Sequence, residues 1–364
     1  MARSAERTHE SATAPTMTAL PPGPITGPSA WRGAEMRRTQ DWIYTLSAVE
    51  IAEIETALAG VRAREIETLR REDFPLPGLG PKLLAMRAEI LNGRGFVLMR
   101  GLPVDRMEPA AAATAYWGIG LHLGKAVSQN SKGHLLGHVR DLGYDVDDPN
   151  VRVYQTSRRQ NFHTDSCDIV GLLCLHKAKR GGLSSLVSSV TVYNEMLAAD
   201  PALTREMFKT FNVDRRGEVP AGMKPYFTTP VFNWNGGFLT TYYVRRYVES
   251  AQRFDDVPQL SAQQTAALDL FDRMAEDDEN RLDMDFEPGD MQFLHNHQIL
   301  HDRTDYEDWS EPDRKRHLLR LWLCPPDGRP LPPCYAQRWG SIEIGDRGGI
   351  VTPDATPHAP LTPI

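Results

Sequence analysis

Two short segments, far apart in the chain, carry residues that could bind a metal ion. The segment Phe-His-Thr-Asp occupies positions 162–165 and the segment Leu-His-Asp-Arg occupies positions 300–303. On an extended segment His163 and Asp165 point the same way, because side chains of a strand alternate between its two faces. With one distant histidine, the pair would place two imidazoles and one carboxylate on one face of a metal. That facial triad is the ligand set of non-haem Fe(II) oxygenases, so the sequence predicts metal chemistry.

The spacing alone leaves open which distant histidine completes the set. We expect a strand over residues 291–300, and His295, His297 and His301 share its side-chain parity. His301 closes the apolar stretch, where an inward-pointing ligand would meet a pocket. His295 and His297 would then lie behind the site or at the surface. The bland alternative for His-X-Asp itself is a hydrogen-bonded pair on a surface strand.

Two arginines, Arg316 and Arg320, interrupt an otherwise apolar stretch over residues 316–323. Their spacing puts both on one face of a strand. An inward arginine would grip a carboxylate with its planar, two-pronged donor group, which lysine could not match. The alternative is that both are charges of an edge strand that reach outward to water.

Composition excludes several classes of protein. The chain of 364 residues carries a net charge of -7. Because binding nucleic acid needs a basic surface, this charge argues against nucleic acid as the main partner. It has no run of 18 apolar residues and no apolar stretch after its first arginines, so we expect neither a membrane span nor a secretory signal. Its four cysteines form no Cys-X-X-Cys pair, and we expect a cytoplasmic protein with free thiols. The composition is compatible with a homo-oligomer.

The pattern of apolar residues and turn signals predicts a mainly β fold with flanking helices. We expect helices over residues 48–71, 81–91, 109–122, 191–199 and 261–275, the first capped by Ser47 with Glu50 in a capping box. The candidate strands are 95–101, 151–156, 169–176, 184–189, 228–234, 238–244, 291–300 and 317–324. Many short strands with glycine turns suggest a double-stranded β-helix, or jelly roll, with helices around it.

Domain boundaries follow from composition. Residues 1–35 are rich in Ala, Thr, Pro and Ser, and such a segment buries too little apolar surface to offset its ordering entropy. We therefore expect a disordered tail over residues 1–35, one catalytic jelly-roll domain over residues 36–352 and a loose tail over residues 353–364.

With these motifs the chain resembles a known family, the taurine dioxygenase (TauD/TfdA)-like enzymes. These are Fe(II)- and 2-oxoglutarate-dependent dioxygenases with a jelly-roll fold. The resemblance covers roughly residues 90–340. Its motifs occur in the family's order and are specific as a set: Phe-His-Thr-Asp at 162–165, Gly-Gly-Leu-Ser-Ser at 181–185, Asn-His-Gln-Ile-Leu-His-Asp-Arg-Thr at 296–304 and Arg-His-Leu-Leu-Arg-Leu-Trp-Leu at 316–323.

The resemblance implies a role for each matching residue. His163, Asp165 and His301 match the iron ligands. Arg316 matches the arginine that holds the distal carboxylate of the cosubstrate 2-oxoglutarate, and Ser184 stands where relatives usually have a threonine that assists. Arg320 matches an arginine that binds an acidic group on the substrate in several relatives.

The implied reaction consumes O2 and 2-oxoglutarate, releases succinate and CO2, and oxidises a C–H bond of a small-molecule substrate. Related halogenases lack the carboxylate ligand, so Asp165 favours hydroxylation, desaturation or cyclisation. Arg320 favours a small carboxylate or amino acid as the substrate. Two further classes use the same residues: a non-redox hydrolase or isomerase with another metal, and a binding protein that retains the metal.

Two loop segments are candidates for the substrate pocket. Residues 129–140 carry His134, His138 and Arg140, and residues 214–226 carry Arg215, Arg216 and Lys224. The alternative for each segment is a set of loop charges exposed to solvent.

Overall fold

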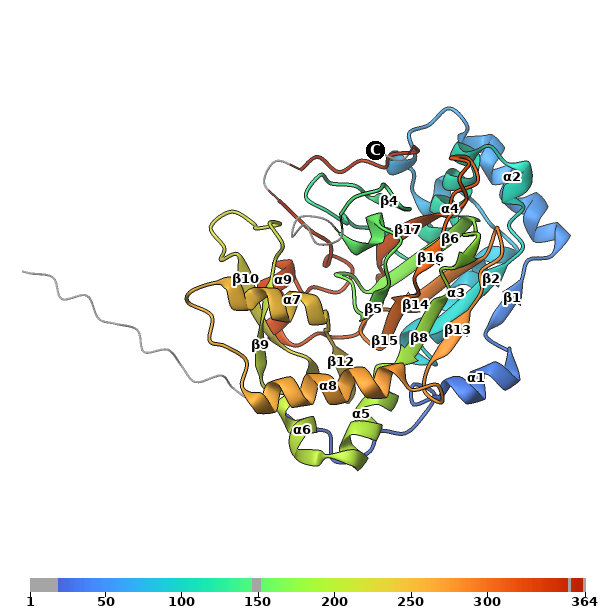
Figure 1. Ribbon diagram of the computed structural model, residues 1–364. Coiled ribbons are helices and arrows are strands. Elements are labelled where there is room, and N and C mark those ends of the chain that lie inside the picture. The colour runs from blue at the N-terminus through green and yellow to red at the C-terminus, as the bar shows by residue number, and fades with distance from the viewer. Residues whose placement is uncertain (1–18, 146–151, 353–354, 363–364) are drawn as a thin grey trace, which may run out of the picture.

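The computed structural model describes residues 19–145, 152–352 and 355–362. Two β-sheets face each other, and helices cover the outer face of each sheet (Figure 1). The α-helices of this described part are α1 (Gly33–Thr39), α2 (Ala48–Val61), α3 (Leu79–Asn92), α4 (Pro109–Leu123), α5 (Ser189–Ala199), α6 (Pro201–Glu206), α7 (Arg245–Ser250), α8 (Ala262–Glu276) and α9 (Ala336–Trp339).

The larger sheet has the strand order β1-β2-β14-β6-β17-β3, and β4 also pairs with β17. Its strands are β1 (Ile43–Thr45), β2 (Phe96–Arg100), β3 (Lys125–Ala126), β4 (Leu136–Val139), β6 (Ile169–His176), β14 (Met291–His295) and β17 (His317–Cys324). All neighbours pair antiparallel except β1 and β2. Strand β17, which carries Arg320, therefore lies inside the sheet and not at its edge.

The smaller sheet has the order β13-β8-β15-β5. Its strands are β5 (Gln160–His163), β8 (Ser184–Ser188), β13 (Leu282–Met284) and β15 (Ile299–Arg303). Three two-stranded ribbons complete the β structure: β7 (Arg180–Gly181) with β16 (Tyr306–Glu307), β9 (Thr210–Asp214) with β10 (Tyr226–Pro230), and β11 (Phe232–Asn235) with β12 (Phe238–Thr241).

Side-chain alternation along the strands builds the layers. Along β17, Leu319 and Leu321 belong to the core beneath α2, α3 and α4, whereas Leu318 and Trp322 belong to the core between the sheets. On β15 of the smaller sheet, Leu300 packs in the core that includes α5 and α8. Figure 1 shows α5 and α8 on the opposite side of the sheets from α2 and α4. Residues of opposite parity to Leu300 therefore face the space between the sheets.

The structure corrects three of the strands that we expected. The segment 228–234 belongs to two strands, because β10 ends at Pro230 and β11 begins at Phe232. The segment 291–300 is not one strand: β14 ends at His295, a turn follows, and β15 begins at Ile299. The segment 151–156 contains a single 3-10 turn over Val153–Gln155, and residue 151 lies outside the described part. The strands 169–176 and 317–324 have the predicted bounds, and Ser47 and Glu50 form the predicted capping box.

Parts of both segments that we expected to be loose tails are packed against the rest of the protein. Trp31 is buried, its indole Nε1 donates to the carbonyl of Arg94, and the backbone N–H of Ile25 donates to Asn194. Near the other end, the backbone of His358 exchanges hydrogen bonds with Gly133 and Leu135. Burial of an aromatic ring and strand-like pairing hold these segments in place despite their composition. Residues 1–18, 353–354 and 363–364 lie outside the described part.

In the part of the chain that the structure describes, no helix has the length and apolar character that a membrane span requires.

Candidate active site

Neighbouring strands of the smaller sheet bring two distant histidines together. His163 ends β5 and His301 lies in the middle of β15, and the register of these antiparallel strands pairs the two residues directly. Their ring centroids lie 4.1 Å apart. His301 has the opposite parity to Leu300, so its side chain faces the space between the sheets.

Asp165, two residues beyond the end of β5, completes a cluster that we call the triad: His163, Asp165 and His301. The carboxylate Oδ1 lies 3.9 Å from His163 Nε2, and Oδ2 lies 3.6 Å from His301 Nε2. One ligand atom from each residue lies within 4.8 Å of the others, which is the span that a single metal ion bridges. No other such cluster of His, Cys, Asp and Glu occurs among the described residues. Two imidazoles and one carboxylate suit Fe(II).

The electrostatics of the triad favour the protonation states that bind a metal. Burial and the neighbouring His301 lower the pKa of His163 to about 3, so its imidazole is neutral at pH 7. Burial alone would raise the pKa of Asp165, but Arg320 and the two histidines lower it well below its ordinary value. A neutral imidazole and an ionised carboxylate are the forms that coordinate metals, so no proton has to leave first.

Asn296, in the turn between β14 and β15, fixes the backbone that carries Asp165. Its side-chain Oδ1 accepts the N–H of Asp165 at 2.7 Å, and its Nδ2 donates to the carbonyls of Asp165 and Cys167 at 2.9 and 2.8 Å. The turn is buried, so these bonds satisfy backbone groups that water cannot reach. This role of Asn296 was not predicted from the sequence. An asparagine between two apolar stretches was the available signal, because asparagine favours turns.

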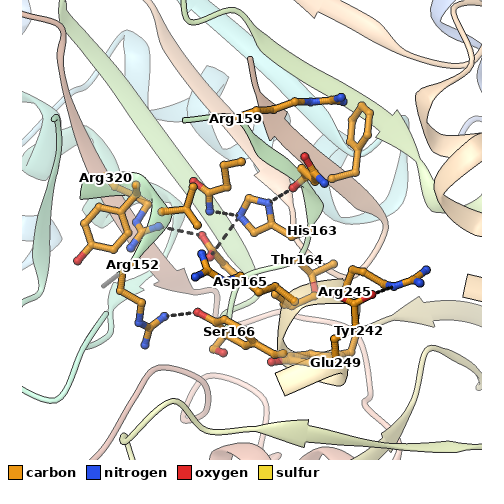
Figure 2. Close-up of a pocket in the computed structure, with 18 of the residues that line it drawn as sticks. Arg152, Arg159, His163, Thr164, Asp165, Ser166, Tyr242, Arg245, Glu249 and Arg320 are labelled. Atoms are coloured by element: carbon orange, nitrogen blue, oxygen red, sulfur yellow. Dashed lines mark hydrogen bonds and ion pairs between the residues drawn. The ribbon is translucent and has the colours of Figure 1, made fainter. Parts of the chain in front are cut away.

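Trp322 and Arg320 of β17 hold the carboxylate group itself. Trp322 donates its indole N–H to Asp165 Oδ2 at 2.9 Å. Arg320 Nη1 lies 3.4 Å from the same oxygen, and Figure 2 marks this contact. Oδ1 receives no such donor and faces His163. The sequence analysis missed Trp322 as well, although it shares the parity of Arg320 on the same strand.

The two remaining histidines of the 295–301 segment lie away from the triad. His297 sits in the turn, where its Nε2 contacts Asp168 Oδ1 at 2.9 Å, and Arg347 also pairs with that carboxylate. His295 ends β14 and is fully buried, and burial lowers its pKa well below the ordinary value. The prediction that the three histidines share one face of a single strand is therefore wrong, because a turn separates His295 from His301.

A small cavity of about 40 Å³ extends from the triad between the two sheets, and we call it the Arg316 cavity. Ser184, His163, His301 and Arg316 line it, together with Arg303 and Arg320. Ser184 stands opposite Arg303 in the pairing of β8 with β15, and its hydroxyl donates to Gln292 at 3.3 Å. The Arg316 cavity thus joins metal-binding groups to buried cationic donors.

Arg316 is buried in a way that calls for an anionic partner. Arg316 is 4% exposed, and among the described residues its Nη1 has no hydrogen-bond partner and no carboxylate forms an ion pair with its guanidinium. Burial lowers the pKa of the guanidinium, the sign of a cation held at a desolvation cost. Burying an unpaired charge costs several kcal/mol, so a bound anion would stabilise this arrangement. Arg316 and Arg320 are both buried, which contradicts the alternative that they reach outward to water.

A second, wider cavity of about 240 Å³ lies on the other side of His163 and Asp165, and we call it the triad cavity. Phe162, Tyr242 and Tyr247 contribute aromatic rings to its lining, and Arg152 and Arg245 contribute cationic groups. Figure 2 shows His163 and Asp165 turned toward one another among the residues that line this space. The triad thus stands between a cavity with buried donors and a cavity wide enough for a second molecule.

Fold and site together are those of an iron oxygenase family. The family described as Taurine catabolism dioxygenase TauD, TfdA family matches residues 62–322. The chain therefore belongs to the TauD, TfdA family of dioxygenases, as the motifs predicted.

Individual relatives agree with this assignment. The chain is 34% identical over 327 residues to FR-33289 synthase of Streptomyces rubellomurinus, covering 87% of this chain and 95% of the relative. It is 29% identical over 324 residues to the taurine hydroxylase-like protein SAT17 of Stachybotrys chartarum, covering 84% of this chain and 83% of that protein. Asparagine oxygenase, solved with Fe(II), a hydroxyasparagine and succinate, superposes with a TM-score of 0.59 over 78% of this chain and 93% of its own, at 15% identity. This last likeness confirms the double-stranded β-helix fold.

Proposed function

We propose that this protein is an Fe(II)- and 2-oxoglutarate-dependent dioxygenase that oxidises a small acidic molecule. Membership of the family supports the assignment of the reaction to the dioxygenase class. The single observation that carries the proposal is the position of the triad, which joins the Arg316 cavity to the triad cavity. An iron oxygenase of this kind needs both spaces, one for its cosubstrate and one for its substrate.

His163, Asp165 and His301 are the proposed iron ligands. Their donor set fits Fe(II), the neutral imidazole of His163 and the ionised carboxylate of Asp165 are forms that bind a metal, and three ligands on one face leave further coordination positions open. Trp322 would keep Asp165 Oδ2 occupied by a hydrogen bond while Oδ1 faces the metal position. Such outer contacts orient a ligand and tune its basicity.

Arg316 is the proposed anchor for 2-oxoglutarate, with Ser184 assisting. The orphaned Nη1 of Arg316 offers a donor in a buried space that also contains the hydroxyl of Ser184. Both would address the distal carboxylate, because a bidentate arginine contact is strong and directional. Serine lacks the methyl of the usual threonine but keeps the hydroxyl donor.

When bound, iron and 2-oxoglutarate activate O2 and release succinate and CO2 while a C–H bond of the substrate is oxidised. The protein orients the reactants and keeps water away, which the buried walls of the triad cavity suit. Because Asp165 occupies the carboxylate position, no place is left there for a halide. Hydroxylation, desaturation or cyclisation is therefore the proposed outcome.

Arg320 is the proposed contact for an acidic group of the substrate. It lines the triad cavity as well as the Arg316 cavity, while its Nε donates to Gln129 Oε1 at 2.7 Å. Its contact with Asp165 gives it a second task, because it also stabilises the ionised form of that ligand. A small acid, carboxylic or otherwise, is the substrate class that this position supports.

A substrate screen tests the proposal. Purified protein would be incubated under air with Fe(II), 2-oxoglutarate and a panel of small organic acids and amino acids, and succinate would be measured. We expect slow succinate release without substrate and a marked stimulation by the true substrate class. Omission of O2 and chelation of iron serve as controls. No succinate above the protein-free level, with iron demonstrably bound, would contradict the proposed reaction.

A further inference from the structure

A third cavity, of about 350 Å³, opens beside the triad cavity, and we call it the cationic pocket. Its walls come from residues 129–140 and from residues 216–218, the two loop segments that the sequence singled out. It shares Arg152, Tyr154 and Arg320 with the triad cavity, so one molecule could occupy both. Of the other charges in these segments, Arg215 is buried against Phe227 and Lys224 pairs with Asp256.

Positive charge dominates this pocket although the chain as a whole carries a net charge of -7. Its described lining residues include five cations, Lys132, Arg140, Arg152, Arg216 and Arg320, and one carboxylate, Glu218. Arg152 pairs with Glu218, and Arg320 lies beside Asp165. Lys132, Arg140 and Arg216 have no ion pair with a carboxylate of the described chain. Among the described residues, these three cations therefore line the pocket without a carboxylate partner.

The backbone at Arg216 is arranged to present its side chain there. Arg216 has φ of 53°, a left-handed conformation that non-glycine residues rarely adopt, and Gly217 follows with φ of 80°. Asp214 holds this turn, because its Oδ1 accepts the backbone N–H of Arg216 at 2.8 Å. The guanidinium of Arg216 then lies 5.8 Å from the ring centroid of Tyr247, which also lines the triad cavity. A strained backbone conformation of this kind persists only where the surrounding structure enforces it, and such conformations are frequent at functional sites.

Arg140 reaches the pocket from the other wall. It follows β4 and its Nε is buried, and within the part of the chain that the structure describes that atom has no hydrogen-bond partner. A buried donor atom without a hydrogen-bond partner is costly unless a ligand accepts its hydrogen bond. Arg140 and Arg216 thus approach one space from two separate loops, and each has a donor group to offer.

We propose that the acidic group of the substrate is a phosphoryl dianion, of a phosphate monoester or a phosphonate, and that Arg140 and Arg216 bind it in the cationic pocket. This inference deepens the proposed function and rests on it for the position of the reacting C–H bond, which would lie beside Asp165 in the triad cavity. A phosphoryl group carries close to two negative charges and three acceptor oxygens. It therefore matches two arginines and a lysine better than a carboxylate, which has one charge and two oxygens.

Arg320, the contact already proposed for the acidic group, would reach the phosphoryl group from the side of the pocket nearer Asp165, next to Tyr154. The Arg320 guanidinium carbon is 4.8 Å from the centroid of the Tyr154 ring, and both side chains line both cavities. The 2-oxoglutarate position stays separate, because Arg316 and Ser184 line the Arg316 cavity and not the cationic pocket.

Binding of small isosteric anions tests this inference without any need for turnover. Methyl phosphate and methyl sulfate have the same shape, but above about pH 7 the phosphate is mostly a dianion, since its second pKa is about 6. Their affinities for the full-length protein would be measured by calorimetry at pH 7.5, with and without Fe(II) and 2-oxoglutarate under argon. Methylphosphonate, as a third probe, distinguishes the two sources of the phosphoryl group.

We expect methyl phosphate or methylphosphonate to bind at least tenfold more tightly than methyl sulfate. Arg140→Gln and Arg216→Gln should each weaken that binding at least tenfold. Arg62→Gln removes an exposed surface arginine just after α2 and serves as the matched control, which should bind like the wild type. The midpoint of thermal unfolding verifies that each variant is folded, and either single variant alone suffices for the test.

Equal affinity for the phosphate and the sulfate would overturn the inference, as would folded Arg140→Gln and Arg216→Gln proteins that bind methyl phosphate like the wild type. A different result would contradict the proposed function. If anion binding behaves as expected but no iron-dependent succinate forms, the dioxygenase proposal is wrong and the cationic pocket remains. If succinate forms but the arginine variants leave the KM of every phosphoryl-bearing substrate unchanged, only the substrate class is wrong.

Discussion

At the scale of single residues, the central assignment is the choice of His301 over its two neighbours. The motif match selected it, and in the structure it alone of the three histidines lies with His163 and Asp165. Iron content of purified variants tests this choice. We expect His163→Ala and His301→Ala to lose tightly bound iron, because each removes one of three protein ligands.

The controls for this measurement are two other histidines. His176→Ala changes an exposed residue at the end of β6 and should keep its iron. His297→Ala should also keep iron if it folds, since its side chain contacts Asp168 and not the triad. Iron retained in His301→Ala but lost in a folded His297→Ala would reverse the assignment.

Arg316 and Ser184 should contribute unequally to the affinity for 2-oxoglutarate. Arg316→Gln removes a buried, charge-assisted contact and should cost about 2–5 kcal/mol of cosubstrate binding. Ser184→Ala removes a neutral hydrogen bond and should cost about 1 kcal/mol. Titration of 2-oxoglutarate into the anaerobic iron-loaded protein measures both. An unchanged affinity in Arg316→Gln would move the role to another arginine of the same cavity, Arg303 or Arg320.

Trp322 should act on iron through Asp165. In Trp322→Phe the aromatic packing is kept but the 2.9 Å hydrogen bond to Oδ2 is lost. Loss of such an outer contact typically weakens metal affinity by about tenfold or more. Trp117→Phe is a matched control, because this buried indole lies in α4 and its Nε1 has no hydrogen-bond partner. Equal iron affinity in both variants would show that Trp322 only fills space.

At the scale of elements, one buried carboxylate joins three of them. Glu50 of α2 pairs with Lys82 of α3 at 2.8 Å and accepts a hydrogen bond from Tyr44 of β1. Burial opposes its ionisation, but Lys82, Tyr44 and the Ser47 cap together lower its pKa from 4.5 to about 2. The folded state therefore favours the ionised form, and the stability that this provides is present above pH 4.5.

Glu50→Gln tests this link, because glutamine can keep the capping box while losing the charge. At pH 7 we expect the variant to be less stable by about 1 kcal/mol, since the lysine partner is half exposed. The difference from the wild type should shrink as the pH falls from 4.5 toward 2, where Glu50 becomes protonated in the folded state. Urea unfolding at a series of pH values measures it, and a difference that is constant with pH would refute the ionic explanation.

The boundaries of helices and strands were predictable where the sequence shows a single, uninterrupted pattern of apolar residues. Strands 169–176 and 317–324 are long, apolar and lie inside the larger sheet, so their patterns had no competitor. The segment 291–300 was misread because both of its strands are buried on both faces, which conceals the turn between them. That turn depends on Asn296 bonding to the distant Asp165 loop, a tertiary contact that local pattern does not encode.

At the scale of the whole molecule, the layers follow from side-chain alternation, and the motif order placed the triad correctly. The three cavities could not be predicted in this way, because each combines residues more than 100 positions apart, such as Arg140 with Arg320. Arg320 illustrates the difference. Sequence indicated a substrate contact, whereas the structure also places it against a proposed metal ligand and at the meeting of all three cavities.

The most direct test of the proposed function is iron-dependent conversion of 2-oxoglutarate to succinate in matched proteins. Wild type, Asp165→Ala and the control His176→Ala would be loaded with Fe(II) under argon, exposed to air, and assayed for succinate and CO2. We predict equal amounts of succinate and CO2 from the wild type and from His176→Ala, and neither product above background from Asp165→Ala. Undiminished succinate from Asp165→Ala, or none from an iron-loaded wild type, would contradict the assignment of the triad as the oxygen-activating centre.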